Sequence, residues 1–200
     1  MNKTAKALLC LALALVLAVL GACAAEEEKE EALYPITLKG AEVRVGETTV
    51  QSLLDQGLHV TWTDENYQAI EVDPETVLEA ESYYTGGNVQ LGGNAFANIS
   101  FTTGEEDATL GQAVIARLEF QLAGVEDAQL LEEIAFDGVP VSQWTRELAG
   151  EKYPDWTGDD TMWLHYGLTY KYDLNFDMGT GKLVKFAVSK EYDVDWDGEG

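Results

Sequence analysis

The chain has 200 residues, with 36 Asp or Glu side chains against 12 Lys or Arg and a formal net charge of −24. Hydrophobic residues make up 46% of it, which is enough to form a core and argues against a wholly disordered protein. The scarcity of basic residues argues against nucleic acid as a partner, and the negative charge opposes electrostatic binding to anionic lipid.

The chain begins with the pattern of a secretory signal peptide, which we assign to residues 1–22. Lys3 and Lys6 precede an uncharged and mainly apolar stretch from 7 to 20. A short basic start followed by an apolar core is typical of such signals, and this core is shorter than a transmembrane helix. We therefore expect the protein to be exported across a membrane.

The signal ends in Leu20-Gly21-Ala22-Cys23, which resembles the lipobox of bacterial lipoproteins. In that family the peptide is cleaved before the cysteine, here Cys23, and the sulfur carries a diacylglycerol. The resemblance implies that the membrane is a partner through the lipid anchor, with the protein on its extracytoplasmic face. Cys10 would leave with the signal, so the mature chain would have no free thiol for catalysis or metal binding. The alternative is an ordinary signal peptide with a cysteine nearby.

Residues 23–32 follow as an acidic tether that begins at the lipidated cysteine. Five of its side chains are glutamates, at positions 26–28, 30 and 31. Because like charges repel one another and the segment has no apolar anchor, we expect an extended spacer. A short helical extension is the alternative.

No Pro-, Gly- or Ser-rich linker divides residues 33–192. We therefore expect one α+β domain, in which short capped helices pack on antiparallel sheet. A weak internal similarity offers a second interpretation, in which the halves 33–125 and 126–192 are tandem helix-plus-sheet repeats. An acidic tail, 193–200, follows the domain.

The first unit of this similarity is a strand over 43–45 followed by a short helix. Thr48 and Gln51 have the spacing of a capping box at the start of a helix. Gly57 is suited to the left-handed position that ends one. The apolar side chains between them recur with helical spacing and predict one buried face, formed by Val50, Leu53, Leu54 and Leu58.

The second unit repeats this order with a strand over 134–136. Ser142 is its expected helix cap, Trp144 and Leu148 share one helical face, and Gly150 ends the helix. Each helix precedes sequence that favours strands. We expect strands over 89–91, 95–102 and 113–122, a short helix over 74–81, and a hairpin of 168–177 with 182–189.

The second unit also resembles uncharacterised lipoproteins of Gram-positive bacteria. The matching residues are Phe136, Gly138, Ser142, Leu148, Gly150, Pro154 and the hairpin from Leu168 to Val188. Three residues separate Gly150 from Pro154, where that family usually has one. The resemblance covers about half the chain and implies a fold like that of secreted β-lactamase inhibitor protein, but it implies little about activity.

No arrangement of residues typical of catalysis or metal binding stands out, because carboxylates occur throughout the chain and a pair of them is not informative. His59 and His165 are the only histidines, and no GxSxG or HExxH motif is present. Asp193, Asp195 and Asp197 match the first half of a calcium loop, but the acidic ligand expected at position twelve is missing. We expect no catalytic residues, no cofactor and no metal, with these three aspartates as a weak candidate.

Aromatic side chains offer the other candidate site. Trp156, Trp163 and Tyr166 surround a polar loop, and Trp62 flanks another. Such rings bind partners when exposed, although they can equally cover the core beneath a loop. The sequence therefore favours a non-enzymatic binding module that meets an extracellular protein or small ligand. The alternatives are an inhibitor or modulator of a secreted or envelope enzyme and, third, an envelope-polymer hydrolase.

Overall fold

The computed structural model describes residues 34–63, 66–158, 163–166 and 169–192. All of them belong to one compact unit. The signal peptide, Cys23, the tether and the candidate calcium ligands Asp193, Asp195 and Asp197 lie outside the described residues. Within the described residues, no helix is both long enough and apolar enough to cross a membrane.

The described fold is mainly β, with antiparallel strands and few short helices. This confirms the antiparallel sheet with short helices, and it corrects the α+β class expected from the sequence to a mainly β one. The small sheet has the spatial order β11-β10-β1-β2 and contains β1 (Ile36–Leu38), β2 (Ala41–Val43), β10 (Ile134–Phe136) and β11 (Val139–Pro140).

The large sheet has the spatial order β12-β13-β14-β9-β7-β6-β3-β4. Its strands are β3 (His59–Thr63), β4 (Ala69–Glu71), β6 (Tyr83–Gly92), β7 (Ala95–Thr102), β9 (Val114–Gln121), β12 (Trp163–Tyr166), β13 (Tyr170–Phe176) and β14 (Leu183–Lys190). A separate ribbon pairs β5 (Val77–Leu78) with β8 (Ala108–Thr109). The helices are α2 (Val50–Asp55), α3 (Ala128–Glu133) and α4 (Arg146–Lys152), with the short 3₁₀ turns η1 (Leu110–Gln112) and η2 (Val141–Gln143).

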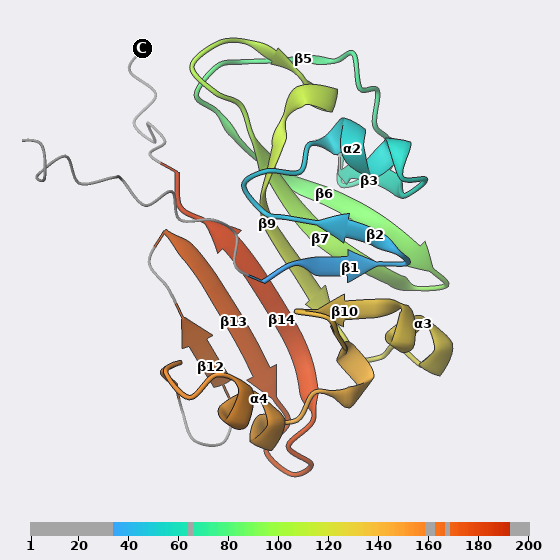
Figure 1. Cartoon of the computed structure of the whole chain (residues 1–200). Helices are drawn as coiled ribbons and strands as arrows, with labels where there is room; N and C mark the ends of the chain where they lie inside the picture. Colours follow the sequence, from blue (N-terminus) through green and yellow to red (C-terminus); the bar gives the residue numbers. More distant parts are fainter. Residues whose placement is uncertain (1–33, 64–65, 159–162, 167–168, 193–200) are drawn as a thin grey trace, which may run out of the picture. The chain divides into compact units, whose positions relative to one another are not determined.

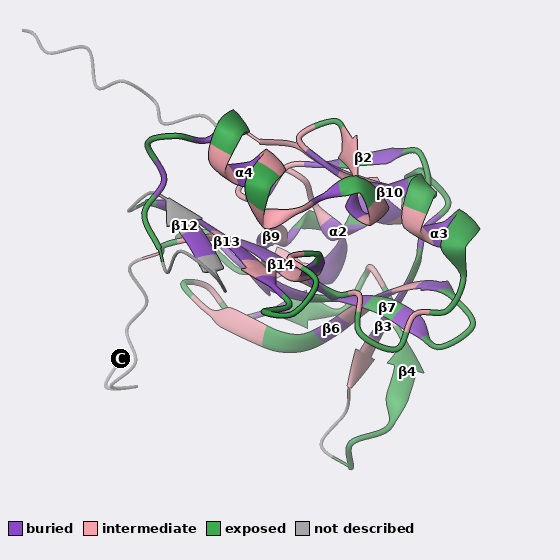
Figure 2. Ribbon diagram, turned by 90° about the horizontal axis from the view of Figure 1, so that it is seen from below, coloured by how far each residue is buried: buried purple, intermediate pink, exposed green. Residues whose placement is uncertain are grey.

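The small sheet and the helices cover one face of the large sheet (Figures 1 and 2). Aromatic side chains fill the space between the two sheets. The ring of Phe136 in β10 lies 5.9 Å from that of Phe186 in β14, and Tyr34 lies 4.9 Å from Tyr172 in β13. Burying these rings against one another supplies the hydrophobic contact that holds the layers together. Among the described residues, no element covers the opposite, open face of the large sheet (Figures 1 and 2).

Helix α2 forms where the sequence predicts it, but its cap is one residue later. The Thr49 side chain accepts a hydrogen bond from the Ser52 amide at 3.2 Å. Thr48 instead accepts from the Arg44 amide at 2.8 Å and so stabilises the preceding turn. Gly57 takes the expected left-handed conformation, with φ at 79°.

Helix α4 differs more from its prediction. Ser142 lies in η2 and donates its hydroxyl to Glu132, whereas Thr145 caps α4 by accepting from the Leu148 amide at 3.1 Å. Trp144 is fully buried beside the β10–β11 hairpin, which holds this stretch out of the helix. Gly150 lies inside α4 and does not end it.

The C-terminal hairpin matches its prediction, whereas two of the short helices do not. The β13–β14 hairpin forms, and Tyr170, Tyr172, Leu174 and Phe176 are buried as expected. The short helix predicted over 74–81 is wrong, because this segment turns and then forms β5. Helix α3, which the sequence analysis missed, begins at an Asp127 side chain that accepts from the Gln129 and Leu130 amides.

The first strands of the two expected halves form matching hairpins. Lys39-Gly40 turns β1 into β2, and Asp137-Gly138 turns β10 into β11, with positive φ at all four positions. Two-residue turns of this kind join antiparallel strands tightly. The two hairpins then pair with each other through β1 and β10.

Candidate functional site

The open face of the large sheet carries a regular array of polar side chains. Residues paired across antiparallel strands point to the same face. On β13, β14 and β9 the register produces three successive rows, which are Lys171–Ser189–Arg117, Asp173–Ala187–Glu119 and Asn175–Lys185–Gln121. Of the charged side chains in these rows, four lie on β13 and β9, and the fifth, Lys185, lies on β14 between them.

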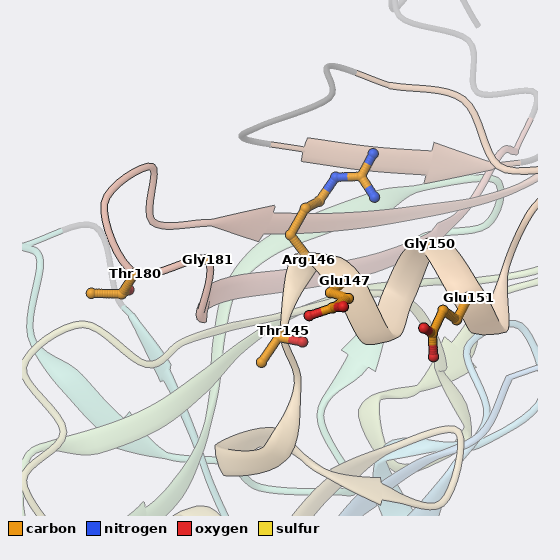
Figure 3. A pocket seen from close by; sticks show the side chains of 7 residues that line it. All are labelled: Thr145, Arg146, Glu147, Gly150, Glu151, Thr180 and Gly181. Atoms are coloured by element: carbon orange, nitrogen blue, oxygen red, sulfur yellow. The ribbon is translucent and has the colours of Figure 1, made fainter.

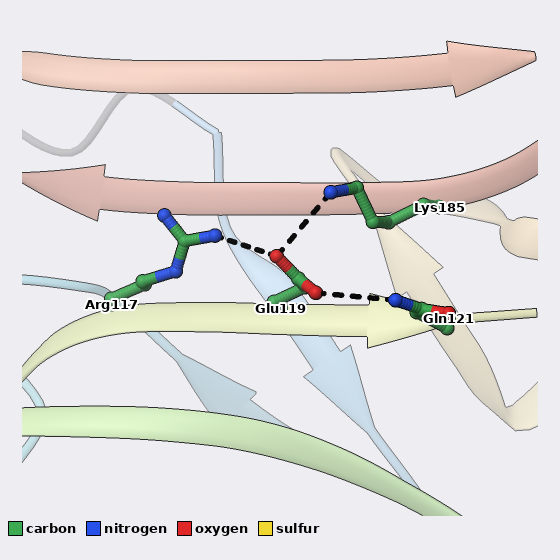
Figure 4. Close-up of polar contacts among 4 residues, drawn as sticks. All are labelled: Arg117, Glu119, Gln121 and Lys185. Carbon is green, nitrogen blue, oxygen red and sulfur yellow. Dashed lines mark hydrogen bonds and ion pairs between the residues drawn. The ribbon is translucent and has the colours of Figure 1, made fainter. Parts of the chain in front are cut away.

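Glu119 links two of these rows (Figure 4). Its Oε2 atom lies 2.6 Å from Arg117 Nη2 and 3.5 Å from Lys185 Nζ, and its side chain is 15% exposed. Burial on its own raises the pKa of Glu119, but the Arg117 hydrogen bond and the Lys185 charge outweigh it and hold the pKa below its usual value. The carboxylate therefore stays ionised and fixes both cations over the sheet.

Beside this network, a cleft of about 300 Å³ lies at the end of β13 and β14. We call it the basic cleft. It is lined by Tyr83, Arg117, Lys171, Ser189, Lys190, Glu191 and Tyr192. Arg117 and Lys171 lie on the open face on either side of Ser189, whereas Lys190 pairs with the buried Tyr170 and points to the covered face. Two cations therefore lie close together in a domain where acids greatly outnumber bases. Because this group of cations contrasts with the negative net charge of the chain, the basic cleft is the strongest candidate site among the described residues.

Contacts in the basic cleft hold its cations but leave donors available. Lys171 Nζ lies 2.6 Å from Glu191 Oε2. Lys190 Nζ lies 5.4 Å and 5.3 Å from the ring centroids of Tyr170 and Tyr192, within cation–π range. An ammonium has three N–H donors and a guanidinium has five, so these contacts do not exhaust Lys171 or Arg117.

The tyrosines add neutral hydrogen-bond donors to the wall of the cleft. Burial raises the pKa of Tyr192 to about 12, with smaller contributions from Tyr170 and Tyr83. Its phenol therefore stays protonated at neutral pH and can donate to an anion. Ser189, in the same row as Lys171 and Arg117, provides a hydroxyl between them.

Two other clefts suit an anion less well. One of about 590 Å³ lies beside α4 and includes Arg146, whose Nε atom is buried with no hydrogen-bond partner among the described residues. Glu147 and Glu151 line the same cleft and point away from Arg146 (Figure 3). The negative charges of these two carboxylates would repel an anionic ligand. The other cleft, of about 340 Å³, lies between loops 92–95 and 124–130 and has no cationic side chain in its lining.

The predicted aromatic patch is not assembled by the described residues. Trp156 is only 7% exposed and stacks on Tyr153 with ring centroids 4.2 Å apart. Trp62 packs edge-on against Phe101 at 5.2 Å and donates its Nε1 hydrogen to the Thr85 carbonyl. Both rings pack against the core, which is the alternative that the sequence left open for them.

The remaining candidate residues from the sequence are the two histidines and the aromatic residues of β12. Strand β12 contains Trp163, His165 and Tyr166, and its register places His165 opposite Asp173. The side chains of these three residues lie outside the described parts of the chain. His59 Nε2 lies 2.6 Å from Glu71 Oε1, but both side chains are mostly exposed and no cleft surrounds them. In the described parts of the chain, no three His, Cys, Asp or Glu side chains come together as candidate metal ligands.

Sequence reasoning missed the basic cleft because its residues come from distant segments. Tyr83, Arg117 and Lys171 are brought together only by the strand order of the large sheet. One signal was present in the sequence. Lysines at 171, 182, 185 and 190 concentrate basic charge in the final hairpin of a strongly acidic chain.

Comparisons of the chain with family models, curated proteins and solved structures find no match. The resemblances to bacterial lipoproteins and to β-lactamase inhibitor protein therefore stay expectations drawn from the sequence.

Proposed function

We propose that the protein is a lipid-tethered, non-enzymatic binding module that takes an anionic ligand in the basic cleft. The observation that carries this proposal is that Arg117 and Lys171 lie in one row, on either side of Ser189, in the lining of one cleft of a chain with a net charge of −24. The remaining acidic surface repels anions at long range, so local geometry would decide which of them bind.

The spacing of the cations favours a ligand with more than one acidic group. Lys171 and Arg117 lie on either side of Ser189 in neighbouring strands. Their Cα atoms are therefore separated by about 10 Å, twice the spacing between strands. Long side chains can span this gap and converge on one phosphate, or each can bind a separate carboxylate of the same ligand. Hydrogen bonds to charged groups contribute about 1.5–3 kcal/mol each.

Neutralising one cleft cation is expected to weaken anion binding about tenfold or more. Lys171→Gln removes one charge from the open-face side of the lining, and a loss of about 1.4 kcal/mol corresponds to a tenfold change in Kd. Calorimetric titration with tripolyphosphate and with citrate at low salt would measure this loss. The matched control is Lys182→Gln, which removes the same charge from an exposed position after the β13–β14 turn.

Two further results would test the same assignment. Glu119→Gln removes the carboxylate that pairs with Arg117, so it is expected to tighten binding. Wild-type protein that binds neither probe at low salt, or a Lys171→Gln variant that binds as well as Lys182→Gln, would contradict the proposal.

An inhibitor or modulator of a secreted enzyme is the second candidate, and the β3–β4 hairpin favours it. The hairpin projects from the edge of the large sheet, and every residue of β4 is exposed (Figure 2). Tyr67 is 88% exposed with φ at 60°, a conformation that costs energy in a non-glycine residue. Ile70, three residues further along the chain, is 47% exposed. An exposed ring held at some cost is suited to insertion into a partner.

Tyr67→Ala separates the two candidates. If the hairpin binds an enzyme, this variant is expected to lose about 2 kcal/mol or more of binding free energy, as hot-spot tyrosines do. Its affinity for tripolyphosphate should be unchanged, because Tyr67 is not part of the basic cleft. Inhibition assays against purified envelope hydrolases, with and without the substitution, would measure the first effect. Equal inhibition by both proteins would remove the hairpin from consideration.

We also infer that the two expected halves, 33–125 and 126–192, are copies of one unit. Each half contains a two-residue hairpin, a threonine-capped helix and strands that end in a central strand of the large sheet. Thr49 bridges to Val114 at the start of β9, and Thr145 bridges to Lys182 before β14. Both bridged residues lie five positions before the central pair, Glu119 with Ala187. This shared register supports duplication more strongly than the sequence similarity does.

A further inference from the structure

We propose that the ligand of the basic cleft is a polysaccharide with acidic groups, whose uncharged sugar units lie on the adjoining part of the open face. This inference rests on the proposed function, because it names the class of ligand that the same site takes. It depends on four side chains of β6 and β7 that we call the neutral strip, namely Asn88, Gln90, Phe96 and Asn98.

The strand register places the neutral strip on the open face, next to the charged rows. Asn98 pairs with Asn88 on one side and with Glu119 on the other, so these three side chains point to the same face. Two residues earlier on β7, Phe96 pairs with Gln90. Alternate residues of a strand share a face, so this second pair also lies on the open side. The strip carries no charge and therefore offers a charged ligand no ion pair of its own.

Phe96 is the apolar member of the neutral strip. It is 43% exposed and belongs neither to the buried core nor to the partly buried side chains that pack against it. One face of a sugar ring is formed by C–H groups and is apolar, whereas its hydroxyl groups project at the edges. Stacking such a face on Phe96 would remove apolar surface of both rings from water, which is favourable.

The amides of the neutral strip supply hydrogen bonds suited to hydroxyl groups. Gln90 donates its side-chain amide to Thr61 Oγ1 at 3.3 Å, and Asn88 donates to the Gly86 carbonyl at 3.1 Å. These contacts orient both amides and leave their side-chain carbonyl oxygens to accept from a ligand. Asn98 is exposed, and its amide can donate as well as accept. A sugar hydroxyl also does both, whereas an ionised carboxylate only accepts.

The neutral strip is continuous with the basic cleft. Phe96 and Ser100 lie on the same side of β7, about 14 Å apart at 3.4 Å per residue. Ser100 pairs with Arg117, which lines the cleft. A ligand that contacts both ends of this distance must therefore be several sugar units long and must place an acidic group at the cleft.

A peptide fits this part of the sheet less well than a polysaccharide does. An extended peptide commonly binds a sheet by pairing with the backbone of a free edge strand. Strands β6 and β7 are interior strands of the large sheet, each with a neighbour on both sides. They present side chains alone, and a polysaccharide is recognised through such contacts.

The test compares three anionic probes by calorimetric titration at low salt. An oligogalacturonate carries sugar rings and carboxylates, an oligoglutamate of equal charge carries carboxylates without sugars, and tripolyphosphate reports on the cleft alone. Phe96→Ala is expected to weaken oligogalacturonate binding about tenfold and to leave tripolyphosphate binding unchanged. Asn98→Ala should weaken oligogalacturonate binding about fivefold, as expected for one lost hydrogen bond. The matched control is Tyr67→Ala, which removes a ring that is 88% exposed from a position outside the strip.

The outcomes distinguish this inference from the proposed function. Weaker oligogalacturonate binding by Phe96→Ala, with Tyr67→Ala unchanged, would support it. Unchanged binding by Phe96→Ala, or equal losses in both variants, would overturn it. Wild-type protein that binds oligoglutamate as tightly as oligogalacturonate would also overturn it, because charge alone would then explain the contact. In each of these cases, tripolyphosphate binding that is lost in Lys171→Gln would leave the proposed function intact. Failure of the wild-type protein to bind tripolyphosphate or citrate would overturn the proposed function, and the inference with it.

Discussion

Replacing Phe136 by alanine is expected to lower the free energy of unfolding by about 3–5 kcal/mol, as for other buried aromatic side chains. Phe136 is fully buried between the two sheets. Its ring centroid lies 5.9 Å from those of Trp144 and Phe186, so its removal leaves a cavity lined by rings that cannot all collapse into it. Urea denaturation followed by tryptophan fluorescence would measure the change.

A matched substitution on the open face provides the control. Phe96 is 43% exposed and pairs with Gln90 on the uncovered side of the large sheet. Phe96→Ala should change the free energy of unfolding by less than about 1 kcal/mol. A loss below about 1 kcal/mol for Phe136→Ala, or equal losses for the two variants, would contradict the proposed division between a packed inner face and an open outer face.

Cys23→Ser is expected to release the protein from membranes. The proposed anchor is a diacylglycerol on the Cys23 sulfur, and two acyl chains hold a protein on a bilayer far more stably than one. Serine has no thiol to accept this lipid, so nearly all of the protein should move to the soluble fraction. Fractionation of cells that produce the full chain, followed by immunoblotting, would measure the change.

Cys10→Ser serves as the control for this variant. Cys10 lies within the predicted signal peptide and would be removed with it. Its replacement should leave the protein in the membrane fraction. Retention of Cys23→Ser in membranes would contradict the lipid-anchor proposal and would leave the resemblance to the lipobox without functional meaning.

Local patterns predicted the elements that are stabilised locally. Helix α2 and the β13–β14 hairpin depend on capping, a turn and alternating apolar residues, and each of these is visible in a short stretch of sequence. Gly57 occupies the predicted position for the same reason. The cap of α4 was misplaced because the decisive interaction is tertiary. Burial of Trp144 against Phe136 keeps residues 141–144 outside the helix and moves its start to Thr145.

The candidate site depended even more on tertiary structure. The sequence places Trp156 beside a polar loop, but its ring stacks on Tyr153 and meets Tyr34 edge-on at the end of the core. Arg117 and Lys171 appear unrelated in the sequence, since they are 54 positions apart in the chain numbering. They meet because β14 pairs with both of their strands. No periodic pattern in a single segment reports such a meeting.

The pairing of β1 with β10 has a consequence for how the chain reaches its native state. Ile36 lies opposite Phe136, so the small sheet joins segments about 100 residues apart. Contacts between distant segments form slowly, because a long loop must close before they provide any stabilisation. The first half cannot complete its core until β10 has been synthesised. A chain that closes this late stays open for longer, which suits passage through a membrane in an unfolded state, as the proposed signal peptide would require.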